Sequence, residues 1–389
     1  MRIAIACGGT GGHIYPGLTL AQTLKQKRPS LDIAFLATGK PIDRALFAKT
    51  PYRVHYLMPC PMPEAASLKW IPFLCRFGIA LCQALWFQAT FRPNCLVAFG
   101  GYVSGPAILS GLLFGKRTLL HEENLVPGRA NRLLASRVTR ISLGFRESAR
   151  FLRQDLPLVT TGPVVRAGLH RLERKAALDS FGLEEKRQTL LVMGGSQGSH
   201  RINTLFLEAI KLFPADLLRS LQVIHLTGQK DAAWVQKAYG DLRVPARVYP
   251  FLEAMGEAYS AAEVAVARGG AMTVAEIIFF RKPAVLIPLT LAQGHQRRNI
   301  QALADQGASI LLTEEEATPS SLAKAMLDTL QDSALRESMR RALEAFETDV
   351  ASERLAGEVL KLVNGVGKSD KRQATRDPKE EKTERLVLK

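Results

Sequence analysis

Two glycine-rich segments have the composition of anion-binding turns. Residues 8–13 read GGTGGH and residues 194–198 read GGSQG; each follows a short apolar run and precedes a segment with helical periodicity. Glycines let an anion approach the main chain closely, and the N terminus of the next helix offers unpaired N–H groups. Neither segment fits G-x-G-x-x-G and the sequence has no P-loop pattern, which counts against NAD enzymes and P-loop NTPases.

Two further glycine pairs follow apolar runs in the same way. Gly100 and Gly101 come after residues 95–99, and Gly269 and Gly270 come after residues 263–267. Tight packing between a strand and a helix would explain a single pair. Four such turns after four predicted strands suggest a cleft lined with main chain, which suits a diphosphate and sugar hydroxyls.

These turns require parallel strands to position them. The two GG segments begin 186 positions apart, at residues 8 and 194, and divide the chain into similar halves. Further apolar runs alternate with helical patterns, which predicts an α/β protein with two doubly wound Rossmann-like domains that face each other across a cleft. The expected domains are residues 1–162, residues 163–365, whose last helix could pack back on the first domain, and a charged disordered tail, 366–389.

Composition narrows the class of protein and its partners. The chain has 389 residues, 47% hydrophobic and 23% charged, which excludes collagen-like and wholly disordered proteins. Lys and Arg number 52 against 36 Asp and Glu, a net charge of +16 that favours an anionic partner. The five cysteines lack zinc spacing, so no metal site or disulfide scaffold is expected. The first residues are too short an apolar run for a signal peptide, which predicts a cytosolic location.

Residues 70–91 form an apolar segment almost long enough to span a membrane. The segment includes Pro72, Arg76, Gln83 and Gln88, so a full span is not expected. Two alternatives remain open and are compatible with each other. The segment is either a buried crossover helix of the first domain or an interfacial helix that contacts lipid, with Lys69, Arg76 and Arg92 near anionic headgroups.

Several motifs together resemble one family. They are GGTGGHIYP at residues 8–16, GGYVSGP at 100–106, HEEN at 121–124, GGSQG at 194–198, GAMTVAE at 270–276 and HQ at 295–296 with Asn299. In this order they look like the MurG family of bacterial glycosyltransferases, and the likeness runs from about residue 2 to residue 350. The resemblance implies an inverting transferase of the GT-B fold, acting in peptidoglycan synthesis as a peripheral protein on the cytoplasmic face of the inner membrane.

The resemblance also implies a reaction. GlcNAc would pass from UDP-GlcNAc to the 4-hydroxyl of MurNAc in undecaprenyl-diphospho-MurNAc-pentapeptide, lipid I, to give lipid II. Such a substitution needs a base for the acceptor and an anion sink for the departing UDP. The sequence has no D-x-D, so we expect no cofactor and no metal, and we expect helix N termini and basic side chains to stabilise the diphosphate.

Site residues carry over by their positions in these motifs. His13 is the candidate catalytic base, because imidazole titrates near neutrality and a helix N terminus favours its neutral form, although His13 could instead cap the loop or bind phosphate. Glu276 would bind ribose, or it could be a solvated helix carboxylate. The acceptor would contact Tyr102 and Asn124, with Glu122 and Glu123 nearby. The candidate donor-binding residues are Thr10, Gly11, Gly12, Arg166, Ser196, Phe251, Leu252, Ala271, Met272, Thr273, Glu276, Gln296 and Asn299.

Some alternatives stay open. For Phe251 and Leu252, simple core packing explains the sequence nearly as well as contact with uracil. Where the family usually has TGNPVR, residues 161–166 read TGPVVR, which leaves the direction of Arg166 open. A UDP-GlcNAc 2-epimerase or another lipid-directed GT-B transferase would share the architecture. A nucleic-acid partner is not expected, because no nucleic-acid-binding motif accompanies the charge. The sequence does not indicate an oligomeric state.

Overall fold

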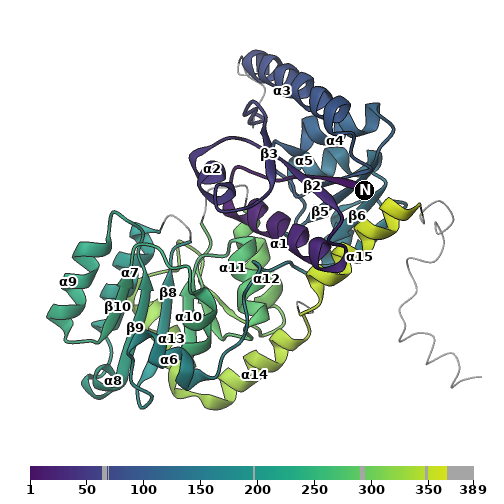
Figure 1. Cartoon of the computed structure of the whole chain (residues 1–389). Coiled ribbons are helices and arrows are strands. Elements are labelled where there is room, and N and C mark those ends of the chain that lie inside the picture. Colours follow the sequence, from purple (N-terminus) through teal and green to yellow (C-terminus); the bar gives the residue numbers. More distant parts are fainter. Residues whose placement is uncertain (64–67, 69, 196–197, 290–293, 347–348, 366–389) are drawn as a thin grey trace, which may run out of the picture. The chain divides into compact units, whose positions relative to one another are not determined.

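The structure is a computed structural model that describes residues 1–63, 68, 70–195, 198–289, 294–346 and 349–365. The chain forms two compact units (Figure 1). Of the described residues, the first unit comprises those within 1–123, 127–162 and 350–365, and the second comprises those within 124–126 and 163–349. The tail predicted at residues 366–389 lies outside the described residues.

A seven-stranded parallel sheet forms the centre of the first unit, in the order β3-β2-β1-β4-β5-β6-β7. Its central strands are almost wholly buried and apolar, as expected for a parallel sheet covered on both faces. The strands are β1 (Arg2–Ala6), β2 (Asp32–Ala37), β3 (Arg53–Tyr56), β4 (Cys95–Ala98), β5 (Arg117–Glu122), β6 (Arg140–Leu143) and β7 (Leu158–Thr160).

Helices cover this sheet and include one from the end of the chain. They are α1 (Gly11–Lys27), α2 (Pro41–Phe47), α3 (Trp70–Phe91), α4 (Ser104–Leu113), α5 (Arg129–Leu134), the 3-10 helices η1 (Ala135–Arg137) and η2 (Arg146–Phe151), and α15 (Ala351–Asn364). Helix α15 packs on α1 (Figure 1). Arg140 pairs with Glu358 at 2.9 Å and Lys27 with Glu353 at 2.5 Å. The last helix is therefore part of the first unit.

The second unit has a six-stranded parallel sheet in the order β10-β9-β8-β11-β12-β13. Its strands are β8 (Gln188–Met193), β9 (Leu221–Leu226), β10 (Ala246–Tyr249), β11 (Val264–Ala267), β12 (Ala284–Leu286) and β13 (Ile310–Leu311). Its helices are α6 (Arg174–Phe181), α7 (His200–Ile210), α8 (Ala215–Ser220), α9 (Ala232–Leu242), α10 (Met255–Ala261), α11 (Ala271–Phe279), α12 (His295–Ala304), α13 (Pro319–Gln331) and α14 (Ser333–Glu344).

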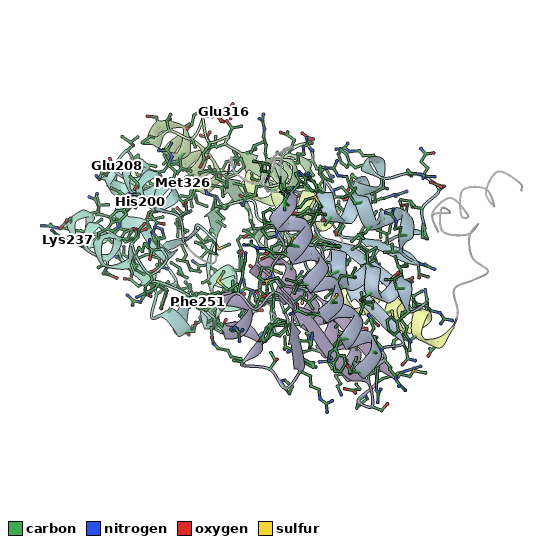
Figure 2. The ribbon with its side chains drawn as sticks, turned by 90° about the horizontal axis from the view of Figure 1, so that it is seen from above. His200, Glu208, Lys237, Phe251, Glu316 and Met326 are labelled. Atoms are coloured by element: carbon green, nitrogen blue, oxygen red, sulfur yellow. The ribbon has the colours of Figure 1, made fainter. Side chains whose placement is uncertain are left out.

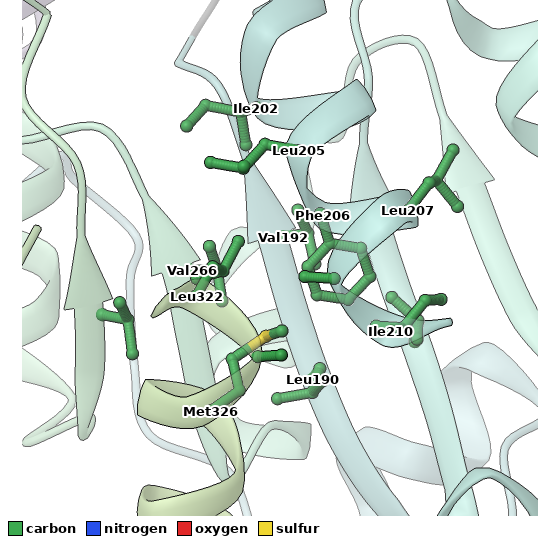
Figure 3. Close-up of a cluster of buried hydrophobic side chains, with 14 of the residues drawn as sticks. Leu190, Val192, Ile202, Leu205, Phe206, Leu207, Ile210, Val266, Leu322 and Met326 are labelled. Carbon is green, nitrogen blue, oxygen red and sulfur yellow. The ribbon is translucent and has the colours of Figure 1, made fainter. Parts of the chain in front are cut away.

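The core of the second unit lies between its sheet and the helices on one face. Phe206 of α7 and Met326 of α13 are fully buried against Val192 and Val266 of the strands (Figure 3). Lys237 and Glu208 point outward from α9 and α7 (Figure 2). The apolar stripes of α7 and α13 thus fix these helices on the sheet, and α7 in turn fixes the turn that precedes it.

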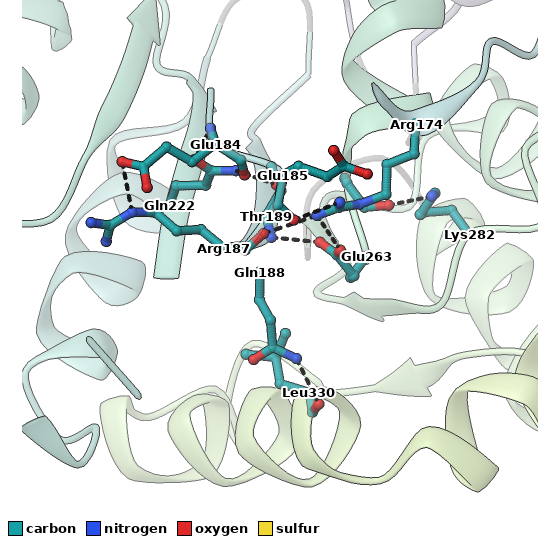
Figure 4. A network of polar contacts seen from close by, with 11 residues as sticks. Arg174, Glu184, Glu185, Arg187, Gln188, Thr189, Gln222, Glu263, Lys282 and Leu330 are labelled. Carbon is teal, nitrogen blue, oxygen red and sulfur yellow. Dashed lines mark hydrogen bonds and ion pairs between the residues drawn. The ribbon is translucent and has the colours of Figure 1, made fainter. Parts of the chain in front are cut away.

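A polar network closes the sheet edge where the strands of the second unit begin (Figure 4). Glu263 pairs with Arg174 of α6 at 2.6 Å and accepts the main-chain N–H of Thr189. Lys282 donates to the Ala262 carbonyl, and burial lowers its pKa to about 8. The network joins α6 to the first residues of β8 and β11, at the edge opposite the glycine turns.

Helix α3 is exposed along one side. Its buried residues are Ala80, Ala84, Phe87 and Gln88, on the side packed against α4. By length and composition alone α3 could cross a membrane, although such a helix also occurs in soluble proteins. The prediction of a crossover helix between two strands is confirmed, but burial applies to only one side.

Candidate functional site

A buried aspartate shapes the first glycine turn. The main-chain N–H of Gly9 donates to Asp43 Oδ1 at 2.9 Å, and Thr38 N donates to Asp43 Oδ2 at 2.7 Å. A Cβ on Gly8 would lie 2.9 Å from Asp43 Oδ2, and Gly9 has φ +87°. Both glycines are therefore required by the turn itself, while Gly11 and Gly12 start α1 and Thr10 caps it in an extended conformation.

His13 lies in the first turn of α1, against the second glycine pair. Its Nδ1 is 3.2 Å from Thr10 Oγ1. Gly100 and Gly101 have φ +90° and +71°, and a Cβ on Gly101 would lie 3.3 Å from Nδ1. The glycines after β4 thus leave the space that the imidazole occupies. Thr10 and His13, from the motif at residues 8–16, and this glycine pair, from the motif at residues 100–106, come together within the first unit.

The electrostatic surroundings of His13 favour a neutral imidazole. Burial lowers its pKa below the ordinary value, and Glu122, a hydrogen bond to the Gly8 carbonyl, Glu123 and Asp43 oppose that shift. Burial is the largest cause of this shift, whereas the sequence suggested the helix N terminus as the cause. A neutral imidazole at physiological pH can accept a proton.

The two glutamates of the HEEN motif are buried. Glu122 Oε2 accepts from Asn131 Nδ2 at 2.7 Å and from Gly128 N at 2.9 Å. Glu123 Oε1 is 2.8 Å from His121 Nε2. His121 Nδ1 contacts Ser142, which in turn contacts Thr161. These carboxylates organise the interior beneath His13.

Tyr102 places its phenol over the first glycine turn. A Cβ on Gly9 would lie 3.3 Å from the Tyr102 hydroxyl, and the Lys40 ammonium lies 5.2 Å from the ring centroid. The hydroxyl has no hydrogen-bond partner within the described part of the chain. The Lys40 ammonium and the unused hydroxyl of Tyr102 therefore both lie beside the turn that precedes His13.

The glycine turn after β8 makes very close main-chain contacts. A Cβ on Gly198 would lie 2.1 Å from the Thr227 carbonyl oxygen, and one on Gly194 would lie 2.3 Å from Ser199 N. Ser199 then caps α7 by accepting from Ile202 N. The turn is thereby held against the end of β9. Ser196, predicted to bind the donor, lies outside the described residues.

Glu276 and Arg166 form an ion pair inside the second unit. Arg166 Nε donates to Glu276 Oε1 at 2.6 Å, and the Glu276 side chain is 1% exposed. Burial raises the pKa of Glu276, while Arg166 and a hydrogen bond from Tyr259 act in the opposite direction. The alternative interpretation of Glu276 as a solvated helix carboxylate is wrong, because α11 turns this residue inward against Arg166.

The other donor candidates of the second unit lie at the ends of strands. Ala271, Met272 and Thr273 are partly exposed in the first turn of α11, where N–H groups lack helical partners. Phe251, just after β10, is 48% exposed (Figure 2), and Leu252 is 9% exposed. Phe251 is therefore not a core residue, whereas Leu252 is mostly buried.

Gln296 and Asn299 lie on α12 and hold neighbouring segments. Gln296 Oε1 accepts from Leu289 N at 2.9 Å. Asn299 Oδ1 accepts from Leu125 N at 2.9 Å, and its Nδ2 donates to Asn124 Oδ1 at 3.1 Å. Asn124, predicted for the acceptor, and Asn299, predicted for the donor, are thus direct partners within the second unit.

Sequence reasoning missed Arg268. It is 5% exposed and donates to the Pro288 carbonyl at 2.9 Å and to Ser199 Oγ at 3.3 Å. It also pairs with Glu314 at 2.8 Å. Arg268 therefore joins the cap of α7 to the segment that leads toward α12. Its position directly before the glycine pair at 269–270 was the available signal.

A buried polar chain behind the same turn was also missed. His225 Nδ1 is 2.8 Å from the Tyr239 hydroxyl, and its Nε2 is 3.1 Å from Asn203 Oδ1. Asn203 Nδ2 donates to the Thr227 carbonyl at 2.9 Å and to Asp231 at 2.7 Å. The Thr227 carbonyl that Gly198 approaches is therefore fixed from within the core.

The arrangement can bind phosphate and move a proton. In each unit the turns provide main-chain N–H groups at helix N termini; the first unit adds His13 as a base, and the second unit adds the charge of Arg166. Over the residues described, no group of three His, Cys, Asp or Glu side chains is arranged to hold a metal ion. Main-chain N–H groups at helix N termini and a guanidinium group can stabilise negative charge on a phosphate.

Two α/β units, each with a parallel sheet and glycine turns at the ends of its strands, form the GT-B fold, and the matches to two family models show the glycosyltransferase class. Models of the glycosyltransferase family 28 N-terminal and C-terminal domains match residues 3–143 and 189–355. The chain belongs to glycosyltransferase family 28.

Individual relatives cover nearly the whole chain. A protein of Desulfotalea psychrophila named UDP-N-acetylglucosamine–N-acetylmuramyl-(pentapeptide) pyrophosphoryl-undecaprenol N-acetylglucosamine transferase is 35% identical over 339 residues, 87% of this chain and 90% of the relative. A protein of Chlorobaculum parvum with the same name is 34% identical, covering 93% and 99%. The Acinetobacter baumannii MurG crystal structure has TM-score 0.73 and 26% identity, covering 93% of this chain and 100% of that one.

The same architecture occurs in enzymes with another activity. A UDP-GlcNAc 2-epimerase from Neisseria meningitidis, solved with UDP-GlcNAc bound, has TM-score 0.64 at 13% identity, covering 93% of this chain and 100% of that chain. At this identity the likeness shows a shared fold and carries no inference about the reaction.

Proposed function

We propose that this protein transfers GlcNAc, with inversion, from UDP-GlcNAc to the 4-hydroxyl of MurNAc in undecaprenyl-diphospho-MurNAc-pentapeptide, the lipid I acceptor. The product is lipid II, an intermediate of peptidoglycan synthesis. The observation that carries the proposal is identity of 30–35% over most of the chain to relatives whose name states this reaction. The buried imidazole beside a glycine turn supports it chemically.

His13 is the proposed base. The acceptor hydroxyl loses its proton to an imidazole nitrogen while its oxygen bonds to the anomeric carbon of GlcNAc. The bond from that carbon to the β-phosphate oxygen breaks, and its electron pair leaves with UDP. Attack opposite the leaving group inverts the anomeric centre. Base catalysis of this kind contributes about 10²- to 10⁴-fold to the rate.

The departing diphosphate requires a positive environment. In the second unit we assign this role to the N termini of α7 and α11, with Ser196 and Arg166, and to Ala271, Met272 and Thr273 in the first turn of α11. In the first unit the same role falls to Thr10, Gly11 and Gly12 at the start of α1. Support comes from the strand-end positions of these turns and from the bonds that hold them rigid.

Donor binding rearranges the Arg166–Glu276 pair. Glu276 is the proposed ribose ligand, yet in the free protein its carboxylate is buried against Arg166. A nucleotide offers a partner to each: ribose hydroxyls for the carboxylate and a diphosphate for the guanidinium. The ion pair is thus exchanged for two contacts with the donor.

The remaining roles follow from the partners seen in the free protein. Gln296 has its amide oxygen engaged by Leu289 N, which leaves its NH₂ to donate to GlcNAc hydroxyls. Both amide groups of Asn299 are engaged, so a sugar hydroxyl binds it in exchange for Asn124. Phe251 and Leu252 frame uracil, and Tyr102 and Asn124 position the acceptor.

A membrane-facing role for α3 completes the proposal. At 100° per residue, Ile71, Leu74, Ile79 and Trp86 lie on one face, opposite the residues packed on α4. Their exposed fractions are 63%, 60%, 47% and 66%. Such an apolar face, on a chain of net charge +16, fits peripheral binding to anionic lipid at the cytoplasmic face of the inner membrane.

Vesicle binding tests the role of α3. Leu74→Glu is expected to reduce sedimentation with phosphatidylglycerol vesicles, because it places a charge in the apolar face. Leu212→Glu is a matched control, since Leu212 is 52% exposed on the second unit. Equal sedimentation of the Leu74 variant and the control would contradict membrane docking through α3.

The reaction itself is tested with labelled UDP-GlcNAc and a lipid I analogue. The proposal expects label in the lipid product and release of UDP only when acceptor is present. Formation of ManNAc and UDP without acceptor would instead identify an epimerase. His13→Ala should lower kcat strongly with little change in the Kd of UDP, and near-native turnover would remove the base role.

A further inference from the structure

A buried amide beneath His13 has an unused oxygen. Asn131 on α5 is 4% exposed, and its Nδ2 donates to Glu122 Oε2 at 2.7 Å. A carboxylate only accepts, so this contact fixes which end of the amide is nitrogen. Among the described residues, Asn131 Oδ1 has no hydrogen-bond partner. A buried polar atom without a partner destabilises the folded protein, so its presence calls for a reason.

The unused oxygen and the imidazole border the same point. A Cβ on Gly100 would lie 3.4 Å from Asn131 Oδ1 and 3.4 Å from His13 Nε2. Gly100 has φ +90°, so any side chain there would be strained as well as crowded. The glycine thus keeps open the space next to both polar atoms.

The other nitrogen of His13, Nδ1, is engaged, because it lies 3.2 Å from Thr10 Oγ1 and close to the Gly8 carbonyl. The imidazole donates to the Gly8 carbonyl, and a Cβ on Gly101 would lie close to both that oxygen and Nδ1, at 3.6 and 3.3 Å. With the proton on Nδ1, Nε2 carries a lone pair. Asn131 Nδ2 lies 3.3 Å from the point that a Cβ on Gly100 would occupy and donates to Glu122, so Nε2 and Asn131 Oδ1 are the two acceptors beside this space.

We propose that Asn131 is a positioning residue for proton transfer: its Oδ1 accepts the Nε2–H of His13 once that nitrogen has taken the acceptor's proton. The inference rests on the proposed function, in which His13 is the base. The acceptor oxygen leaves its proton on Nε2 and bonds to the anomeric carbon, and UDP departs with the electron pair of the broken bond. The new N–H then finds Asn131 Oδ1, which Glu122 holds from behind.

The proposed contact would offset the unfavourable effect of burial on the protonated imidazole. Burial disfavours the imidazolium that the reaction creates, and Glu122 is the largest of the groups that oppose this effect. In the proposal Asn131 links Glu122 to the imidazolium of His13: the Glu122 carboxylate polarises the NH₂ of Asn131, and Asn131 Oδ1 accepts from the imidazolium. The charge is thus stabilised without a carboxylate in direct contact with the base.

A double-mutant cycle tests the proposal. Asn131→Ala should lower kcat at least about tenfold while the KM for UDP-GlcNAc changes by less than about twofold. In a His13→Ala background the same substitution should lower kcat no further, because Asn131 acts through the imidazole. Asn131→Leu, which retains most of the side-chain volume, is made in parallel in case the alanine variant does not fold.

The control is another buried amide with an unused oxygen in the same unit. Gln88 is fully buried between α3 and α4, and its Oε1 has no partner among the described residues. Gln88→Leu, assayed with a soluble acceptor analogue, is expected to leave kcat unchanged. This separates loss of a buried amide from loss of the contact with His13.

Each outcome points to a different conclusion. Loss of kcat by Asn131→Ala to the same extent with and without His13 would overturn the inference and indicate a structural role, while the reaction proposal would stand. Near-native turnover of Asn131→Ala would overturn it too. Near-native turnover of His13→Ala would remove the base from the proposed function, whatever Asn131 does.

Discussion

Glu276→Ala offers a quantitative test of how the donor binds. In the free protein the Glu276 carboxylate pairs with Arg166 at 2.6 Å, and it is proposed to exchange this partner for the two ribose hydroxyls. The substitution removes the ribose ligand and at the same time frees Arg166. The expected change in UDP affinity is therefore the difference between two contributions.

The size of the expected change in UDP affinity follows from the negative charge of the Glu276 carboxylate, which accepts the hydrogen bonds of the ribose hydroxyls. A hydrogen bond to a charged group contributes about 1.5–3 kcal/mol, so two ribose hydroxyls would gain about 3–6 kcal/mol. Opening the ion pair offsets part of this gain, although Arg166 recovers a partner in the diphosphate. We expect a net loss near the strength of one such bond, about 1.5–3 kcal/mol, which weakens UDP binding about 10- to 150-fold.

Isothermal titration calorimetry with UDP and with uridine measures this effect. Glu276→Ala should weaken both ligands, since both carry the ribose. Arg166→Ala should weaken UDP but not uridine, because it removes a diphosphate contact and also the competitor for Glu276. An unchanged Kd of UDP in Glu276→Ala would refute the ribose assignment. Parallel losses for both ligands in Arg166→Ala would refute the exchange.

The remaining predictions concern pH. Burial lowers the pKa of His13 below 6.5, and the base must be neutral, so kcat/KM should stay level from pH 8 to 6.5 and fall only below pH 6.5. This decrease at acid pH should be absent from His13→Ala. A decrease that begins near pH 7.5 in the native enzyme would contradict the prediction. Burial lowers the pKa of His225 to about 3, so the unfolded state binds one more proton than the folded state between pH 6.5 and 3. In urea unfolding, this group should therefore lower the free energy of unfolding by about 1.4 kcal/mol for each pH unit as the pH falls. His225→Gln should show a smaller slope over that range, and an unchanged slope would count against a neutral buried imidazole.

The fold could be predicted where a continuous apolar run in the sequence is followed by glycine. Continuous apolar runs such as those of β1 and β8 mark buried parallel strands, and the glycines after them mark the strand ends. Because parallel strands end at one edge of a sheet, the turns could be expected to hold the site. Strands β3 and β7 were not predicted, since they are short, only partly buried and not continuously apolar.

The site was predictable in part. Residues next to glycine turns, such as His13, could be chosen because a motif fixes their place. Asp43 could not, because it reaches the site from another element, α2, to hold Gly9. Arg268 stands directly before a glycine pair, but its contact with Ser199 at the start of α7 could not be predicted. Burial of a charged side chain depends on partners distant in sequence, and one sequence without those contacts does not reveal it.

The ion pair between Arg166 and Glu276 shows most clearly what could not be predicted from the sequence. The two residues are 110 positions apart, and each was assigned to a separate part of the nucleotide. Sequence reasoning treated them as independent ligands that await the donor. Since a buried carboxylate needs a cation or a hydrogen bond, the free protein satisfies Glu276 with its own Arg166. A ligand that supplies only ribose or only phosphate leaves one of the two charged groups without its partner. The ion pair therefore favours a ligand that carries both groups, which is the chemistry of a nucleoside diphosphate.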